Sequence, residues 1–506
     1  MSNHLHDGLI GLQAGNRSCF LMLNEPGATG YEISFAQLAD LSSRYANMLA
    51  AHDVRPGDRV AAQVPKRSEM LALYLATVQA GAVFLPLNTG YRQEELVYFL
   101  EDASPGLFLC EDRTARDLEP VARRMGTTLL TLNADGSGSL AVAVASMKES
   151  HEPAPRQPDD LAALLYTSGT TGRPKGAMLT HENLLSNALS LVDAWQMTSS
   201  DVLIHALPIY HTHGLFVAMN TALIAGARVD FMPGFDLEAI IGALPGSTLM
   251  MGVPTFYVRL LGDPRLDRRL ASNMRLFISG SAPLLAETHA AFARRTGHHI
   301  LERYGMTETS MITSNPVIGL RQAGAVGMPL DGVELRIVAA GGQEVPAGDI
   351  GLVEVRGPNV CRGYWRSVEK TAEAIRDDGF FMTGDLGRLN ENGYLEIVGR
   401  QKDLIITGGL NVYPKEVEDV LNALDGVAES AVFGIPDPEY GERIVAAVSP
   451  EPGVTVDIGL IGHEIAGRLA RFKTPRKIEM VDQLPRNSMG KVEKNVLRQR
   501  YSDPDG

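Results

Sequence analysis

The segment Tyr166–Leu179 combines the residue types that bind a chain of phosphate groups. It reads YTSGTTGRPKGAML and directly follows the apolar stretch Leu161–Leu165. Glycine lets backbone N–H groups approach an anion, hydroxyl groups add hydrogen-bond donors, and lysine adds a positive charge. The residues with these properties are Thr167, Ser168, Gly169, Thr170, Thr171, Gly172 and Lys175. The sequence therefore predicts a polyphosphate-binding loop.

Two other interpretations of this loop are weaker. A G-x-x-x-x-G-K-[ST] nucleotide loop is excluded, because Lys175 follows Pro174 and precedes Gly176. A surface loop rich in glycine, serine and threonine is the remaining alternative, since short motifs of this kind also occur without a ligand. The grouping of all the donors directly after a buried strand favours phosphate binding.

Other short segments carry groups that suit a nucleotide. Tyr304–Glu308 reads YGMTE and offers an aromatic ring that can cover a base, followed by hydroxyl and carboxylate oxygens. Thr383–Asp385 ends in a carboxylate that can accept hydrogen bonds from both ribose hydroxyl groups, and Pro485–Lys491 reads PRNSMGK. Taken singly, these segments have simpler interpretations as a surface glutamate, a turn and a lysine on a solvated helix face.

Together and in this order, the segments resemble the signature motifs of the adenylate-forming superfamily, which includes acyl-CoA synthetases, luciferases and the adenylation domains of peptide synthetases. The resemblance extends to Gly399–Asp403, which reads GRQKD, and covers nearly the whole chain. It implies a reaction in two steps, with ATP and CoA as co-substrates and Mg²⁺ as the metal. A carboxylate attacks the α-phosphate of ATP to give acyl-AMP and pyrophosphate, and the thiolate of CoA then displaces AMP.

The resemblance also implies a role for each motif residue. Glu308 would bind Mg²⁺, a cation that prefers carboxylate and phosphate oxygens. Lys491 would be the catalytic lysine of adenylation, where a fixed positive charge stabilises the transition state. Besides the loop residues, the implied ATP- and AMP-binding residues are Tyr304, Gly305, Met306, Thr307, Asp385 and Arg400.

The segment expected beside the acyl group is more polar than a fatty-acid tunnel requires. It reads HALPIYHTHGLF over His205–Phe216. Tyr210, His211 and Gly214 match an aromatic-His-x-x-Gly element of the family, which implies that His211 acts beside the acyl group. His213 adds a second imidazole in the same turn. Either histidine alone could equally be structural.

Two arginines could bind a second carboxylate of the substrate. Arg303 directly precedes Tyr304, at a position where many relatives have glycine, and Arg259 lies within the apolar segment Val253–Leu261. A guanidinium group binds a carboxylate through paired hydrogen bonds. A structural ion pair is the alternative for each arginine.

The runs LIHALPIYHTHGLF, MGVPTFYVRLL, LFISGSAPLLAETH and LERYGMTET resemble the malonyl-CoA synthetases within this superfamily. This closer resemblance implies malonate as the acid, with methylmalonate also tolerated. It departs from the relatives at Ser310–Thr313, where Ile312 could change which α-substituents are accepted. The alternatives are a CoA ligase for another short or aryl acid, an adenylation enzyme that loads a carrier protein, and a nucleotide-binding protein without catalysis.

The elements that position these segments are predicted to alternate along the chain. A capping box, Ser34 with Gln37, opens a helix over 35–51, and it is followed by a strand over 59–64, a helix near 69–80 and a strand over 83–87. A helix near 94–102 and a strand over 106–110 continue the series. Such alternation predicts an α/β fold with layered sheets, largely parallel, and helices.

The pattern changes near Gln401, where strand signals come only in short pieces, over 404–407, 430–433 and 444–448. We therefore expect a large N-terminal domain over 1–401 and a small mobile α+β domain over 402–506. The resemblance implies that Lys402 is the hinge between the two half-reactions, with Asp403 as the alternative. It also implies that Gly408 and Gly409 let the pantetheine arm of CoA approach.

Composition excludes several other classes of protein. The 506 residues include 46 Lys and Arg against 60 Asp and Glu, a net charge of −14 that argues against nucleic acid as a partner. The 3 cysteines are scattered, which fits a reducing compartment and neither a disulfide framework nor a thiolate metal site. The N-terminus lacks the pattern of a signal peptide, and the longest apolar stretch is interrupted by Gly81 and Pro86. We expect a cytoplasmic protein without a membrane partner.

Overall fold

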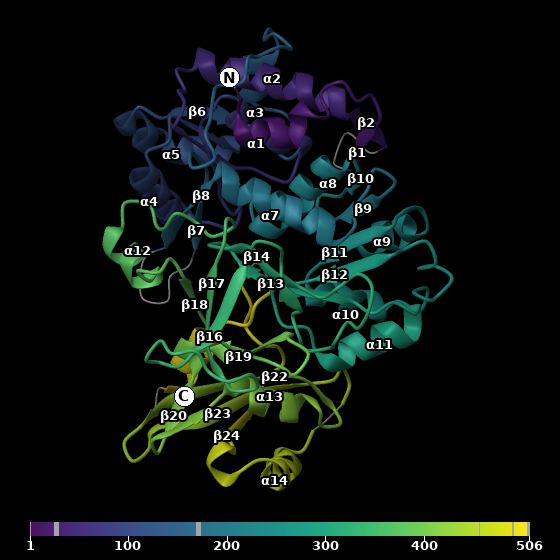
Figure 1. Ribbon diagram of the computed structural model, residues 1–506, viewed down its shortest axis with the longest axis vertical. Helices are drawn as coiled ribbons and strands as arrows, with labels where there is room; N and C mark the ends of the chain where they lie inside the picture. The colour runs from purple at the N-terminus through teal and green to yellow at the C-terminus, as the bar shows by residue number, and fades with distance from the viewer. Residues whose placement is uncertain (1, 25–29, 168–173, 455, 488–489, 503–506) are drawn as a thin grey trace. The chain divides into compact units, whose positions relative to one another are not determined.

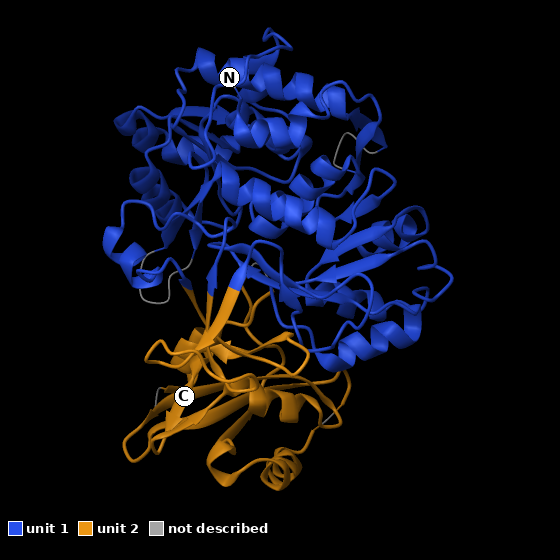
Figure 2. Ribbon diagram, in the orientation of Figure 1, with its two compact units in different colours: residues 1–334, 355–381 blue, residues 335–354, 382–506 orange. Residues whose placement is uncertain are grey.

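The computed structural model describes residues 2–24, 30–167, 174–454, 456–487 and 490–502. The chain divides into two compact units, which are coloured separately in Figure 2. The large unit consists of Met1–Glu334 and Val355–Phe381, and the small unit consists of Leu335–Glu354 and Met382–Gly506. The predicted class is confirmed: an α/β body with layered sheets is accompanied by a smaller α+β part.

The first sheet of the large unit has six strands and carries the ends of the phosphate loop. Three of its strands, β6, β7 and β8, are labelled in Figure 1. In spatial order they are β6 (Thr128–Thr131), β5 (Leu107–Cys110), β3 (Arg59–Gln63), β4 (Val83–Pro86), β7 (Leu161–Thr167) and β8 (Lys175–Thr180). All neighbours are parallel except β7 and β8, which pair antiparallel. Strands β4 and β5 are buried throughout, as continuous apolar strands of a covered parallel sheet are.

The second sheet of the large unit has nine strands and carries the YGMTE segment. Their order is β15 (Met328–Pro329), β14 (Ser310–Ser314), β13 (Leu301–Met306), β12 (Leu276–Ser279), β11 (Leu249–Gly252), β9 (Val202–His205), β10 (Arg228–Phe231), β1 (Cys19–Leu23) and β2 (Tyr31–Ser34). The strands from β13 to β1 are parallel, and antiparallel strands close both edges.

Helices lie between these strands along the chain, as the alternation predicts. The capping box at Ser34 is confirmed, because the N–H of Gln37 donates to Ser34 Oγ at 3.2 Å and the N–H of Ser34 donates to Gln37 Oε1 at 2.8 Å. The helices of the large unit are α1 (His4–His6), α2 (Phe35–Ala51), α3 (Ser68–Gln79), α4 (Gln93–Ala103), α5 (Asp112–Met125), α6 (Ser139–Val144), α7 (His181–Ala194), α8 (Asn220–Ala225), α9 (Leu237–Ala243), α10 (Pro254–Leu261), α11 (Ala286–Thr296) and α12 (Val368–Ala374). The described residues of this unit also form the short helical segments η1 (Asp7–Gly11), η2 (His213–Met219) and η3 (Leu244–Gly246).

The small unit is built on two sheets. Most of the four-stranded sheet belongs to it, in the order β16 (Glu334–Val338), β17 (Gly351–Arg356), β18 (Phe381–Leu389) and β19 (Leu395–Arg400). The five-stranded sheet contains β21 (Leu410–Val412), β20 (Ile405–Thr407), β23 (Gly441–Pro450), β22 (Val427–Asp437) and β24 (Lys477–Met480). Its helical elements are η4 (Gln401–Asp403), α13 (Pro414–Asn422), α14 (Ile458–Arg468), η5 (Arg471–Lys473) and α15 (Lys494–Ser502).

The prediction that strands after Gln401 are all short is wrong. Strands β22 and β23 pair over most of their 11 and 10 residues and form one long antiparallel hairpin. Alternate residues enter two different cores: Val432 packs with residues of α13 and α14, while Phe433 packs with Leu497 of α15. The hairpin is long because both of its faces are covered.

The compact units change over between Phe381 and Met382, whereas the sequence predicts domains 1–401 and 402–506. The domain boundary near Gln401, which rests on the change in strand pattern, stays a prediction. Among the described residues, no helix combines the length and the apolar character needed to cross a bilayer.

Candidate active site

Strands β7 and β8 bring the two ends of the predicted phosphate loop together. Thr167 ends β7 and Lys175 opens β8, and the two residues are antiparallel partners. The hydroxyl group of Thr167 donates to Glu308 Oε1 at 3.2 Å, and Lys175 Nζ lies 5.0 Å from the centre of the Tyr364 ring. The fold thus groups three residues that the sequence singles out. The others predicted in this loop, Ser168, Gly169, Thr170, Thr171 and Gly172, lie outside the described residues.

Glu308 is buried and keeps one carboxylate oxygen for a ligand. The hydroxyl group of Tyr364 donates to Oε1 at 3.1 Å, the same oxygen that accepts from Thr167, and no hydrogen bond between described residues reaches Oε2. Across the described ranges, no three His, Cys, Asp or Glu side chains form a metal site by themselves. One free carboxylate oxygen fits Mg²⁺, because this ion binds one or two carboxylates together with waters and substrate phosphates.

The residues before Glu308 form a half-buried rim at the end of β13. The pairing of β13 with β14 shifts register between Tyr304 and Gly305. A Cβ atom at Gly305 would lie 2.0 Å from the carbonyl oxygen of Ser310, so a side chain does not fit there. Glycine at this position therefore has a steric reason, while Tyr304, Met306 and Thr307 stay partly exposed and accessible to a nucleotide.

Arg303 is a buried cation, and no carboxylate among the described residues pairs with it. It is 3% exposed, and its Nε and Nη2 atoms have no hydrogen-bond partner among the described residues. Burial lowers the pKa of Arg303 to about 9, against a smaller opposite effect of Tyr257. The guanidinium group lies against Gly280, where a Cβ atom would be 2.3 Å from Arg303 Cζ. An unpaired charge away from water is costly, so this arrangement calls for an anion.

Two neutral histidines lie near Arg303. Burial and then the charge of Arg303 lower the pKa of His211 to about 4, and the same two causes lower the pKa of His213 well below its ordinary value. The backbone N–H of His213 donates to His211 Nδ1 at 3.3 Å, and Ser281 Oγ lies 3.2 Å from His213 Nδ1. His213 Nε2 has no partner in the described part of the chain. Both imidazoles are therefore uncharged at neutral pH, and one polar atom remains for a ligand.

Arg259 lies in different surroundings from Arg303. It is exposed on α10, and its guanidinium group lies 5.2 Å from the centre of the Phe235 ring. No contact among the described residues links it to Arg303. The structure therefore brings His211, His213 and Arg303 together and leaves the other predicted arginine outside the group.

Some residues of the site escape sequence reasoning. Tyr364 binds Glu308 and faces Lys175, yet it lies outside the motifs that the sequence shares with the adenylate-forming superfamily. Gly280 and Ser281 support Arg303 and His213 from the turn after β12, where Ser281 has a φ of +70°. A serine in this left-handed conformation is uncommon, but only the coordinates reveal it.

In the small unit, Asp385 and Arg400 form a close ion pair. They are partners across β18 and β19, and Arg400 Nε lies 2.6 Å from Asp385 Oδ1. Asp385 is buried, and its backbone N–H donates to Thr383 Oγ1 at 3.0 Å. The Thr-Gly-Asp turn thus holds its carboxylate in a fixed position beside an arginine.

Lys491 lies near this pair within the small unit. The residue is exposed, yet desolvation by surrounding protein atoms, followed by the positive charge of Arg400, lowers the pKa of Lys491 to about 8. Its backbone N–H donates to Asn487 Oδ1 at 3.0 Å. At neutral pH the side chain is still mostly protonated, but its proton is held less firmly than that of an ordinary lysine.

The predicted hinge and glycine turn are both on the surface of the small unit. Lys402 is exposed in η4, while Asp403 accepts a hydrogen bond from Arg498 Nη2 at 2.8 Å. Gly408 and Gly409 have φ values of +57° and +78° and form the two-residue turn between β20 and β21. A Cβ atom at Gly409 would meet nothing within 4 Å, so crowding does not require glycine there. The positive φ of the turn is the reason that glycine is favoured.

The chain matches two family descriptions along its length. Residues 13–365 match the AMP-binding enzyme family, and residues 416–491 match the AMP-binding enzyme C-terminal domain. The chain belongs to the AMP-binding enzyme family. The family predicted from the motifs is confirmed.

Relatives with known names agree with this assignment. The chain is 36% identical to a feruloyl-CoA synthase from Amycolatopsis, covering 93% of this chain and 94% of the relative. It is 33% identical to a malonate–CoA ligase from Arabidopsis thaliana, covering 94% and 86%. Among solved structures, ATP-bound MatB from Rhodopseudomonas palustris is similar with a TM-score of 0.96 and 52% identity, over 99% of both chains.

Proposed function

We propose that this chain is an AMP-forming ligase that joins malonate to coenzyme A through malonyl-AMP. The observation that carries the choice of acid is the buried guanidinium group of Arg303, whose Nε and Nη2 atoms lack partners among the described residues. The 33% identity to a malonate–CoA ligase supports the same choice. Methylmalonate is proposed as a second acid.

A diacid suits the acyl region better than an aryl monoacid does. In adenylation one carboxylate of the acid forms a bond to the α-phosphate and loses its negative charge. A second carboxylate of the same acid is then needed to neutralise Arg303. Ferulate has a single carboxylate and would leave this charge unpaired, although a feruloyl-CoA synthase is 36% identical to the chain. His213 Nε2 supplies a further polar contact for the second carboxylate. A CoA ligase for an aryl or other short acid is the alternative that the test must exclude.

The first half-reaction forms a bond from a malonate oxygen to the α-phosphorus of ATP and breaks the bond to pyrophosphate. We assign the phosphates to Thr167, Lys175 and the loop between them, the adenine to Tyr304, and the ribose to Asp385 and Arg400. Lys491 supplies positive charge to the carboxylate and α-phosphate oxygens as negative charge develops there. His211 is assigned to the acyl group, where its neutral state avoids adding a second cation beside Arg303.

Mg²⁺ fits Glu308, which has a carboxylate oxygen available, and when bound it would neutralise phosphate oxygens. In the second half-reaction the thiolate of CoA attacks the acyl carbon and AMP leaves. We propose that the domain 402–506 turns about Lys402 between the two steps, since Asp403 is tied to Arg498 and Lys402 is not part of that ion pair. Gly408 and Gly409 are assigned to the approach of the pantetheine arm.

The proposal is tested by pyrophosphate release with malonate, methylmalonate, acetate, butyrate and benzoate, followed by assay of the thioester with CoA. Malonate is expected to have the highest kcat/KM. A preference for acetate or benzoate would contradict the assignment of a diacid. Formation of the acyl-AMP without any thioester when CoA is supplied would favour a carrier-loading enzyme.

A comparison of two arginine variants tests the assignment within the site. Arg303→Leu should raise the KM for malonate by about 100-fold, because a charged pair away from water is lost, and should leave the KM for ATP within about twofold. Arg259→Leu removes an exposed arginine that stacks on Phe235, and its effect on the KM for malonate should be much smaller. Equal effects of the two substitutions would show that Arg303 is structural.

A further inference from the structure

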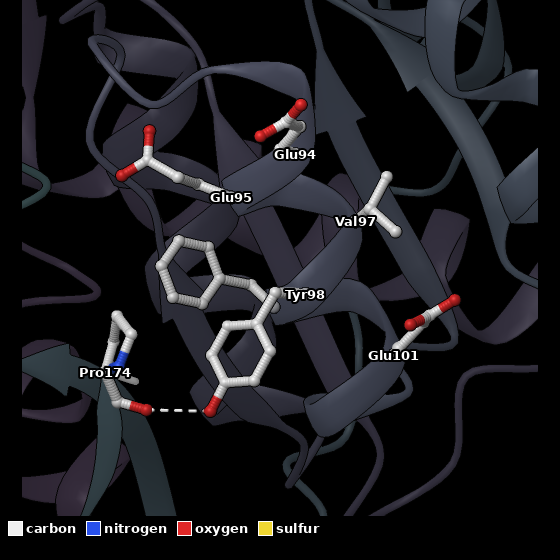
Figure 3. A pocket seen from close by; sticks show the side chains of 7 residues that line it. Glu94, Glu95, Val97, Tyr98, Glu101 and Pro174 are labelled. Atoms are coloured by element: carbon white, nitrogen blue, oxygen red, sulfur yellow. Dashed lines mark hydrogen bonds between the residues drawn. The ribbon is translucent and has the colours of Figure 1, made fainter. Parts of the chain in front are cut away.

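Helix α4 contacts both ends of the phosphate loop. The hydroxyl group of Tyr98 donates to the carbonyl oxygen of Pro174 at 2.8 Å, on the side that enters β8 (Figure 3). One turn later on the same helix, the carboxylate of Asp102 accepts a hydrogen bond from the hydroxyl group of Tyr166, on the side that leaves β7. These contacts join segments 76 and 64 residues apart in the chain.

Each contact falls one residue before a side chain assigned to the nucleotide. Tyr166 directly precedes Thr167, which donates to Glu308, and Pro174 directly precedes Lys175, which faces the Tyr364 ring. The bond at Pro174 holds a backbone carbonyl group, and the bond at Tyr166 holds the side chain of the residue before Thr167. Each bond therefore limits the position of the residue that follows it. A shift of α4 against the sheet would therefore move both Thr167 and Lys175.

Helix α4 is itself held firmly enough to act as a support. Its apolar face, including Leu96, Phe99 and Leu100, is buried in the core that also contains Leu164 of β7. At its end the carbonyl oxygen of Asp102 accepts from Trp365 Nε1 at 3.2 Å and from Arg366 Nη1 at 2.8 Å. The backbone N–H of Trp365 in turn donates to the carbonyl oxygen of Gly176 at 2.8 Å, next to Lys175.

The hydrogen bonds between α4 and the loop ends involve the hydroxyl groups of Tyr98 and Tyr166. Aromatic packing alone would not require these groups. The rings of Tyr98 and Tyr166 pack on Phe99, with centres 5.5 Å and 4.6 Å apart, and phenylalanine would preserve these contacts. The hydroxyl groups add hydrogen bonds that fix how each ring is oriented. Burial, followed by the bond to Asp102, raises the pKa of Tyr166, so its hydroxyl group stays a donor.

We propose that Tyr98 and Asp102 are positioning residues for ATP, which hold the two ends of the phosphate loop at the spacing that the polyphosphate chain needs. This inference rests on the proposed nucleotide site, and it adds the residues of α4 that hold that site in place. The effect is specific to the β- and γ-phosphates, because Thr167 and Lys175 are assigned to the polyphosphate, whereas adenine and ribose are assigned to other residues. AMP should therefore be insensitive to this support.

The experiment measures the dissociation constants of MgATP and AMP by calorimetric titration, without any acid, for the full chain and its variants. Tyr98→Phe and Tyr166→Phe each remove one hydroxyl group and keep the ring. Each should raise the Kd of ATP about fivefold, as expected for the loss of one hydrogen bond, while the Kd of AMP stays within about twofold. Tyr91→Phe is the matched control, since Tyr91 also packs on Phe99 but its hydroxyl group makes no hydrogen bond to a described residue.

The outcomes separate this inference from the function on which it rests. Unchanged ATP affinity in both variants, or equal weakening of ATP and AMP, would overturn the positioning role while leaving the ligase intact. Failure of the unsubstituted chain to bind ATP would overturn both proposals. As a second readout, the conversion of supplied malonyl-AMP and CoA to malonyl-CoA should proceed at the original rate in both variants, because that step involves no pyrophosphate.

Discussion

Arg303 of the large unit and Arg400 of the small unit both lie beside predicted nucleotide motifs. The two arginines differ in whether a carboxylate pairs with their charge. Arg400 is paired with Asp385 at 2.6 Å, across neighbouring strands. Arg303 is 3% exposed and has two nitrogen atoms without a partner in the described part of the chain. Within the ranges that the structure describes, Arg400 has a counter-charge and Arg303 has none.

This difference indicates what each residue does. A paired arginine with a buried carboxylate is fixed in place, so it can orient neutral groups such as ribose hydroxyls. A buried arginine without a counter-charge costs stability in the free protein, and a ligand anion can recover that cost on binding. We therefore expect recognition of the acid at Arg303 to depend on charge, and recognition of the ribose at Asp385 and Arg400 to depend on their fixed geometry.

The largest expected effect concerns the lysine near the paired arginine. Lys491→Ala should slow adenylation by about 1,000-fold, a typical loss when a charge that stabilises the transition state is removed. Thioester formation from supplied malonyl-AMP should continue. The measurement is the rate of each half-reaction, with Lys477→Ala as control, because Lys477 is exposed and paired with Glu479. Equal loss of both half-reactions would contradict the assignment of Lys491 to the first step.

A smaller effect is expected when the paired arginine loses its partner. Asp385→Ala removes the ion pair between Asp385 and Arg400, and the free energy of unfolding should fall by about 2 kcal/mol. Urea denaturation of the unliganded protein measures this change. An unchanged midpoint would mean that the pair contributes nothing to the fold and that the two arginines do not differ as described.

The smallest effect should have the opposite sign. Arg303→Leu replaces a buried, unpaired charge by an apolar side chain, and the free energy of unfolding without ligand should rise by about 1 kcal/mol. The same denaturation measurement applies, and added malonate should stabilise the original protein but not the variant. Destabilisation by Arg303→Leu would indicate that the arginine has a structural partner.

Much of this architecture could be predicted from local sequence. Helix α2 begins at the predicted capping box, and the phosphate loop does follow a buried strand, because caps and strand patterns depend on neighbouring residues. The motifs and their order identified the family, since each motif is a short run of neighbouring residues that can be recognised without the structure. The long β22–β23 hairpin was missed because its length depends on two cores that form on opposite faces.

The features that decide the chemistry depend on contacts between distant residues. The sequence predicts Arg303 as the first candidate and Arg259 as the second, and burial together with the space beside Gly280 separates them in the structure. Tyr364 and the bonds from α4 were not predicted, because Tyr364 meets Glu308 across 56 residues and α4 meets the loop across 64 or more. Such pairings follow from sheet order, which residue types alone do not specify.

We propose that Arg303 selects a diacid through the second negative charge of that acid. The most direct test compares kcat/KM for malonate with that for its monomethyl ester, which has nearly the same shape and one carboxylate fewer. We expect a preference for malonate of about 100-fold or more in the original protein and a ratio near one in Arg303→Leu. A similar ratio in both proteins, or no preference in the original, would contradict it.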